Sequence, residues 1–156
     1  LGDGKIRPNQ LFALSLTYPV INPNSEIAKN MINIVEKKLL NNYGLKTLAK
    51  GEEKYIEVYE GDPCHRDTSY HQGITWPWLL GLYYNSLKNI EKEEKDKEIK
   101  AQTSQKIEKF KNKFKKIDNY NIIYVKISIN SSKENIADFY LFCYFFNIFS
   151  QRTNNC

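Results

Sequence analysis

The chain has 156 residues, of which 41% are hydrophobic and 13% aromatic, so it can bury the core of one domain or of part of a larger one. Its formal net charge is +5, and most of the excess comes from residues 88–118, which hold eleven lysines and seven acidic residues. The signs alternate there, as in KNIEKEEKDKEIK, which is typical of a solvated helix face. No interleaved aromatic and basic pattern accompanies them, so we expect no nucleic-acid partner.

The first part of the chain predicts two helices joined by a loop. Residues 9–17, NQLFALSLT, follow Pro8, which suits a first helical turn, and the loop TYPVINPN comes next. Ser25 then opens a stronger helix, which we expect Gly44 to end in the left-handed conformation. The apolar residues of this helix recur at threes and fours and predict one buried stripe: Ile27, Met31, Ile34, Val35 and Leu39.

Residues 45–75 show no sustained period and predict a long loop, of the kind that often carries function. A helix is expected from Pro77 through Ile90, with the charged run 91–98 as its frayed end or a linker. The spacing predicts a last helix near 100–117 on an apolar stripe: Thr103, Ile107, Phe110, Phe114 and Ile117. Since strand signals are few before residue 120, these elements predict an all-α fold.

The end of the chain differs in character. NIIYVKISIN, residues 121–130, alternates like a strand, and an apolar run rich in Phe and Tyr follows. That run is too short, and too interrupted by Asp138 and Asn147, to span a bilayer, so we expect no membrane partner.

Three cysteines, Cys64, Cys143 and Cys156, lie far apart without a CxxC pair, which predicts neither a disulfide framework nor a zinc site. A reduced, cytoplasmic setting is therefore the default expectation. The chain begins at Leu1, in what looks like the middle of a domain, and we expect it to be a fragment of a longer protein. No GxSxG, Walker or GxGxxG pattern occurs, so serine-hydrolase, nucleotide and dinucleotide chemistry have no support.

The segment SYHQGITWPWLLG, residues 69–81, holds both tryptophans of the chain. Core packing at a helix start explains Trp76 and Trp78. Equally, an indole face beside the amide of Gln72 and the imidazole of His71 is suited to hold a sugar ring, whose hydroxyls bond to fixed polar groups. The residue types alone do not favour either of these two interpretations.

Two further polar segments are candidates for the same kind of site. YEGDPCHRDTSY contains Arg66 and three carboxylates, of which Asp62 and Asp67 fit a solvated loop, one member of a glycosidase pair or a group that binds a sugar hydroxyl. IRPNQ gathers Arg7, Asn9 and Gln10 at a helix start, where a cap and surface polarity are the simpler explanation. No regular spacing gathers three metal ligands in either segment, so no metal site is predicted.

Taken together, these blocks resemble one family. IRPNQLFALSLTYPV, then KKLLNNYGLKTLAKGEEKYIEVYEGDPCHRDTSYHQGITWPWLLG, are similar in order and spacing to the C-terminal glucosidase domain of glycogen debranching enzymes. The likeness covers roughly residues 5–87 and includes several rare residues in register. Thr17 stands where that family usually has Pro, and Ile74-Thr75 replaces Thr-Val.

The resemblance implies an α/α toroid of six helical hairpins, of which residues 1–118 would form late hairpins. It implies amylo-α-1,6-glucosidase activity on the branch stubs of glycogen or limit dextrin, with inversion and without cofactor. By position, the residues that would line or border the sugar pocket are Arg7, Asn9, Gln10, Arg66, Asp67, His71, Gln72, Trp76 and Trp78.

The same comparison leaves the catalytic pair unassigned. The family's reacting carboxylates lie upstream and in a later segment of the form SEI-x-DGD, which this chain lacks. Residues 119–156 are therefore expected to be a divergent or out-of-frame tail, and the chain alone is expected to be inactive. The alternatives are another α/α-toroid glycosidase, or a carbohydrate-binding or structural helical remnant.

Overall fold

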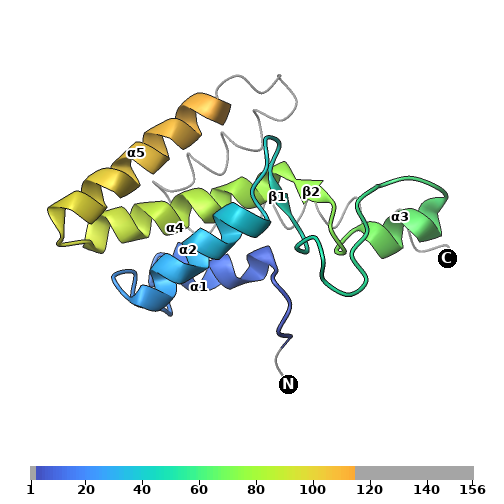
Figure 1. Cartoon of the computed structure of the whole chain (residues 1–156), viewed down its shortest axis with the longest axis horizontal. Coiled ribbons are helices and arrows are strands. Elements are labelled where there is room, and N and C mark those ends of the chain that lie inside the picture. Colours follow the sequence, from blue (N-terminus) through green and yellow to red (C-terminus); the bar gives the residue numbers. More distant parts are fainter. Residues whose placement is uncertain (1–2, 115–156) are drawn as a thin grey trace.

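The structure, a computed structural model, describes residues 3–114, which are mainly helical (Figure 1). The predicted tail at 119–156, its boundary and the expected strand at 121–130 lie outside the described residues. The elements are η1 (Pro8–Leu11), α1 (Phe12–Ser15), α2 (Glu26–Lys38), β1 (Leu45–Lys46), α3 (Pro63–Ser69), β2 (Thr75–Trp76), η2 (Pro77–Leu79), α4 (Leu80–Glu93) and α5 (Lys97–Phe114). The all-α prediction therefore holds apart from one two-residue ladder.

Helix α4 is the centre of the core. Helices α1, α2 and α5 all contact it, and α5 returns along it after a short turn (Figure 1). Its buried residues follow helical spacing, so one long face meets its three neighbours. The residues of α4 in the core cluster are Leu80, Tyr83, Tyr84, Leu87 and Ile90.

Helix α2 begins as predicted but buries a different face. Ser25 caps it, because the Ala28 N–H donates to the Ser25 Oγ at 3.2 Å. Of the predicted stripe, Ile27 and Ile34 are instead 63% and 39% exposed. Ala28 and Ile32, each one position after a residue of the predicted stripe, are buried together with Val35 and Leu39. Since both sets recur at threes and fours, spacing alone could not choose the face that meets α4 and η1.

Contrary to the expectation from the sequence, Gly44 does not end α2. The helix ends at Lys38, and the N–H groups of Leu39 and Leu40 both donate to the Val35 carbonyl at 2.9 Å. Gly44 instead lies against the backbone of the other strand, where an added Cβ would be 2.5 Å from the Trp76 carbonyl oxygen. A glycine is needed here because β1 and β2 approach closely.

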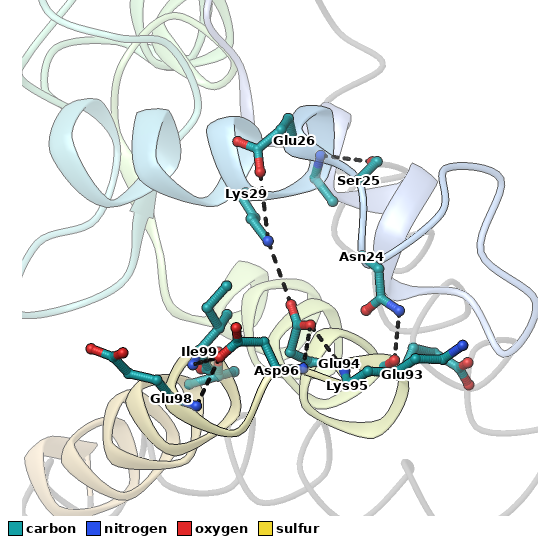
Figure 2. A network of polar contacts seen from close by, with 12 residues as sticks. Asn24, Ser25, Glu26, Lys29, Glu93, Glu94, Lys95, Asp96, Glu98 and Ile99 are labelled. Atoms are coloured by element: carbon teal, nitrogen blue, oxygen red, sulfur yellow. Dashed lines mark hydrogen bonds and ion pairs between the residues drawn. The ribbon is translucent and has the colours of Figure 1, made fainter.

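The charged run 91–98 is ordered and is not a frayed end: residues 91–93 complete α4, residues 94–96 form a turn, and residues 97–98 begin α5. Glu94 is only 8% exposed, and its Oε1 accepts from the backbone N–H groups of Lys95 and Asp96 at 2.9 and 3.0 Å. Its Oε2 lies 3.5 Å from the Nζ of Lys29 on α2 (Figure 2). One carboxylate therefore fixes the turn between α4 and α5 and joins it to α2.

Helix α5 starts directly after this turn. The Oδ1 of Asp96 accepts from the N–H groups of Glu98 and Ile99, so Asp96 caps the helix (Figure 2). The helix begins at Lys97, three residues before the predicted start. Thr103, Ile107 and Phe110 of the predicted stripe are buried.

Candidate functional site

The short turn His71-Gln72-Gly73 lies beside the ladder. Gly73 has a φ of +140°, and an added Cβ would lie 2.4 Å from the Ile56 carbonyl oxygen and 2.6 Å from the Tyr55 ring. Its N–H donates to the buried Oγ1 of Thr47 at 2.9 Å. Both the φ and the close approach exclude a side chain at this position, so the turn requires glycine.

Backbone hydrogen bonds hold this turn from two sides. The Ile56 N–H donates to the Gln72 carbonyl at 2.6 Å, and the Thr47 N–H donates to the Ile74 carbonyl at 3.0 Å. The latter bond extends the antiparallel ladder, in which Leu45 pairs with Trp76. Residues 47 and 56, which the sequence left inside an unstructured loop, are thus the support of the candidate site.

Arg7 joins the N-terminal segment to the same turn. Its Nη1 donates to the carbonyls of His71 at 2.6 Å and Thr47 at 3.3 Å, and its Nη2 donates to the Gln72 Oε1 at 3.3 Å. Its Nε donates to the Asp3 carboxylate at 3.0 Å. The structure therefore brings together Arg7, His71 and Gln72, three predicted site residues that the sequence separates by more than sixty positions.

The charge of Arg7 also acts on its carboxylate partner. The pKa of Asp3 is lowered, first by the backbone N–H of Lys5 and then by the hydrogen bond from Arg7. The Arg7 side chain is only 20% exposed. A guanidinium that is largely covered and bound to four acceptors is fixed in one orientation.

The other two residues of IRPNQ have different positions. The Gln10 amide donates to the Arg7 carbonyl at 2.8 Å and so stabilises the start of η1. Asn9 is exposed on η1, where its carbonyl accepts from the Phe12 N–H. Gln10 therefore supports the backbone that carries Arg7.

An aromatic cluster borders the turn. The ring of Tyr70 lies 4.6 Å from that of Trp76, 5.5 Å from that of His71 and 5.9 Å from that of Tyr59, between centroids. The Trp76 indole donates to the Tyr70 carbonyl at 3.2 Å. Burial raises the pKa of the Tyr70 hydroxyl, and the charges of Tyr59 and Asp67 add to it. The cluster adjoins the His71-Gln72-Gly73 turn through the contact between the Tyr70 and His71 rings.

Both tryptophans also contribute to the core. Trp76 on β2 and Trp78 on η2 are partly buried and pack against the core cluster. Packing and ligand binding are therefore compatible for these indoles, since neither ring is fully covered.

Arg66 and Asp67 lie on a helix that the sequence did not predict. In α3, the Asp62 carboxylate accepts from the His65 N–H at 2.9 Å, which is an N-cap, and Pro63 occupies the first turn. The adjacent Asp-Pro pair was the signal that could have revealed this helix. Arg66 and Asp67 are exposed there, and Figure 1 shows α3 set apart from α1, α2, α4 and α5.

The chemistry of α3 includes two further features. The pKa of Asp62 is lowered, mainly because its carboxylate accepts from the His65 backbone N–H and then from the His65 side chain. Cys64 is disulfide-bonded, which the cysteine spacing did not predict.

Residues 3–114 have few other features that could form a site. No group of three or more His, Cys, Asp or Glu residues in this range could hold a metal ion. Nor does any helix within the range combine the length and apolarity needed to cross a membrane.

A cavity of about 300 Å³ lies among α2, α4 and α5, lined by residues that include Glu36, Tyr83 and Lys106. None of the predicted site residues lines it, so it is separate from the candidate site.

Comparison with known proteins identifies the family. The family model described as amylo-alpha-1,6-glucosidase matches residues 2–134, so it covers most of the 156 residues and extends into the expected tail. No solved structure matches the chain. The match includes the arginine of IRPNQ, the helix α3 and the whole SYHQGITWPWLLG segment. The chain belongs to the amylo-alpha-1,6-glucosidase family.

Proposed function

We propose that this chain is part of a glycogen debranching α-1,6-glucosidase and supplies one wall of the pocket that holds the glucose branch stub. The observation that carries the proposal is the junction of Arg7 with His71 and Gln72. It fixes the amide of Gln72, two residues after Tyr70, whose ring lies 4.6 Å from that of Trp76. A pyranose binds to such a surface with its apolar face on a ring and its hydroxyls on fixed polar groups.

The family's reaction needs two carboxyl groups on opposite sides of the glycosidic bond, one to protonate the leaving oxygen and one to activate water. We assign neither group to this chain. Asp62 and Asp67 are exposed on α3, and the lowered pKa of Asp62 is unsuited to a general acid at neutral pH. The chain would bind the glucan, while residues elsewhere in the parent protein would hydrolyse it.

The proposed setting follows from the family resemblance. The α4–α5 hairpin and the α1–α2 pair would be late hairpins of an α/α toroid, closed by helices of the parent protein. Exposed apolar residues in the α1–α2 pair and its connecting loop, among them Leu16, Val20 and Ile27, are suited to such contacts. The enzyme would be cytoplasmic and would need no cofactor.

Tryptophan fluorescence tests the binding proposal directly, because Trp76 and Trp78 are the only indoles. Isomaltose, with its α-1,6 bond, and maltohexaose should change the emission saturably, whereas β-linked cellobiose at the same concentration should not. The Trp76→Ala variant should lose most of the response. A response equal for all three sugars would contradict the proposal.

A structural remnant without ligand binding is the second candidate, and the packing of both indoles against the core favours it. It predicts no fluorescence change with any sugar. Glucose release from limit dextrin by the purified chain, above that of the Trp76→Ala variant, would contradict both candidates.

A further inference from the structure

The side-chain amide of Gln72 has a fixed orientation. Arg7 Nη2 lies 3.3 Å from the Gln72 Oε1. A guanidinium donates hydrogen bonds and accepts none, so the atom that faces Arg7 must be the amide oxygen and not the nitrogen. The chemistry of the partner therefore settles the assignment of the two amide ends.

Arg7 is itself fixed before any ligand arrives. Its Nε is bound to Asp3, and its Nη1 to the carbonyls of Thr47 and His71, so four of its five N–H donors have acceptors within the protein. This network leaves Arg7 little freedom to turn toward a sugar. Its main role would be to position Gln72, rather than to bind a hydroxyl directly.

Among residues 3–114, no hydrogen-bond partner is found for the Gln72 Nε2, although the side chain is partly buried. We infer that Gln72 serves as a hydrogen-bond donor to the ligand, with Arg7 as the residue that orients it, and that the site therefore selects a hydroxyl oxygen able to accept. This inference rests on the proposed glucan-binding function. It deepens that function by giving the polarity of one contact.

The Gln72→Glu variant separates a donor from an acceptor. A glutamate has nearly the same shape, can still accept from Arg7 and keeps a free acceptor oxygen, but it has no N–H to donate. Glucans are uncharged, so the new charge does not repel them. We expect isomaltose and maltohexaose to bind the variant about tenfold more weakly, which is the order of one lost hydrogen bond. Affinity within twofold of the wild type would overturn the inference.

The matched control is Gln102→Glu, which makes the same change on the exposed surface of α5 and should leave both affinities unchanged. Arg7→Lys provides the second arm. A lysine keeps the positive charge but lacks the planar fork, so it should release the Gln72 amide and weaken binding severalfold. The thermal midpoint of Arg7→Lys should be compared with that of Asp3→Ala, which removes the Arg7–Asp3 contact but leaves the Arg7–Gln72 contact.

A measurement without sugar keeps the inference separate from the proposed function. In ¹⁵N-labelled protein, the side-chain amide signal of Gln72 should shift in Arg7→Lys but not in Gln102→Glu. An unchanged signal would overturn the positioning role of Arg7. Failure of the wild-type chain to bind any glucan would overturn the proposed function and the donor role, while the amide signal would still decide the positioning role.

Discussion

Lys29 of α2 lies 3.5 Å from the carboxylate of Glu94, the residue whose other oxygen accepts from two backbone N–H groups of the α4–α5 turn. The Glu94 side chain is 7% exposed and that of Lys29 is 28% exposed. Asn24, just before α2, donates to the Glu93 carbonyl in the same region (Figure 2). Three helix ends thus meet at one carboxylate.

Replacing Glu94 should destabilise the fold in a pH-dependent way. The pKa of Glu94 is lowered, first by the backbone N–H of Asp96, with burial opposing this and Lys29 adding to it. A carboxylate with a lowered folded-state pKa stabilises above its unfolded pKa and loses that contribution as pH falls through the folded value. Glu94→Gln should lower the thermal midpoint by several degrees at pH 7, and by much less near pH 3.

The measurement is a pair of thermal unfolding curves at each pH, with Glu93→Gln as the control. Glu93 is exposed and takes part in this network through its backbone carbonyl. An equal loss for Glu94→Gln at both pH values would show that its charge is not the stabilising feature.

Gly44→Ala should disrupt the ladder. The new methyl carbon would lie 2.5 Å from the Trp76 carbonyl oxygen. Because that oxygen belongs to the backbone, it cannot rotate away, so the strands would have to separate. We expect a loss of about 1–3 kcal/mol in the free energy of unfolding, which is typical of overpacking. Gly4→Ala is the control, because no atom lies within 4 Å of its added Cβ. Urea unfolding of both variants decides the matter.

Tyr83→Phe should destabilise the protein without affecting sugar binding. The Tyr83 hydroxyl donates to the Glu36 carboxylate at 2.7 Å, and Lys106 lies 3.0 Å from the other Glu36 oxygen. A hydrogen bond to a charged group is worth about 1.5–3 kcal/mol. Burial raises the pKa of Tyr83 far above its usual value, so its hydroxyl should remain protonated, and able to donate, in alkaline solution.

The control for this change is Tyr43→Phe, since Tyr43 is 68% exposed. Urea unfolding should show a loss for Tyr83→Phe only, and the glucan affinity of both variants should equal that of the wild type. A changed affinity in Tyr83→Phe would mean that the helical core and the candidate site are coupled.

Tyr55 should influence the site through Gly73. Its hydroxyl accepts from the Lys46 Nζ at 2.6 Å, and its ring lies where a side chain at residue 73 would be. Tyr55→Ala would remove the ring that covers Gly73, and we expect glucan affinity to fall about tenfold. Tyr55→Phe keeps the ring and should lose no more than severalfold. Equal affinities for both variants in the fluorescence titration would exclude this role for the ring.

Much of the candidate site was accessible from the sequence because its segments have distinctive composition. IRPNQ and SYHQGITWPWLLG contain rare residues at close spacing, and Arg7, His71 and Gln72 do lie together. The supporting residues were not accessible. Thr47 and Ile56 act through their backbone or a small hydroxyl, and no residue type marks such a role in advance.

The sequence by itself determined where α2 and the η2–α4 segment begin and which segments are polar or apolar, because caps and periodicity act within a few residues. Ser25 and Pro77 marked their helices for that reason. Only the tertiary structure decided which face of α2 is buried, why residue 44 is glycine, and that Arg7 orients Gln72. Each of these depends on a partner far along the chain, whose position is set by packing around α4 and not by local spacing.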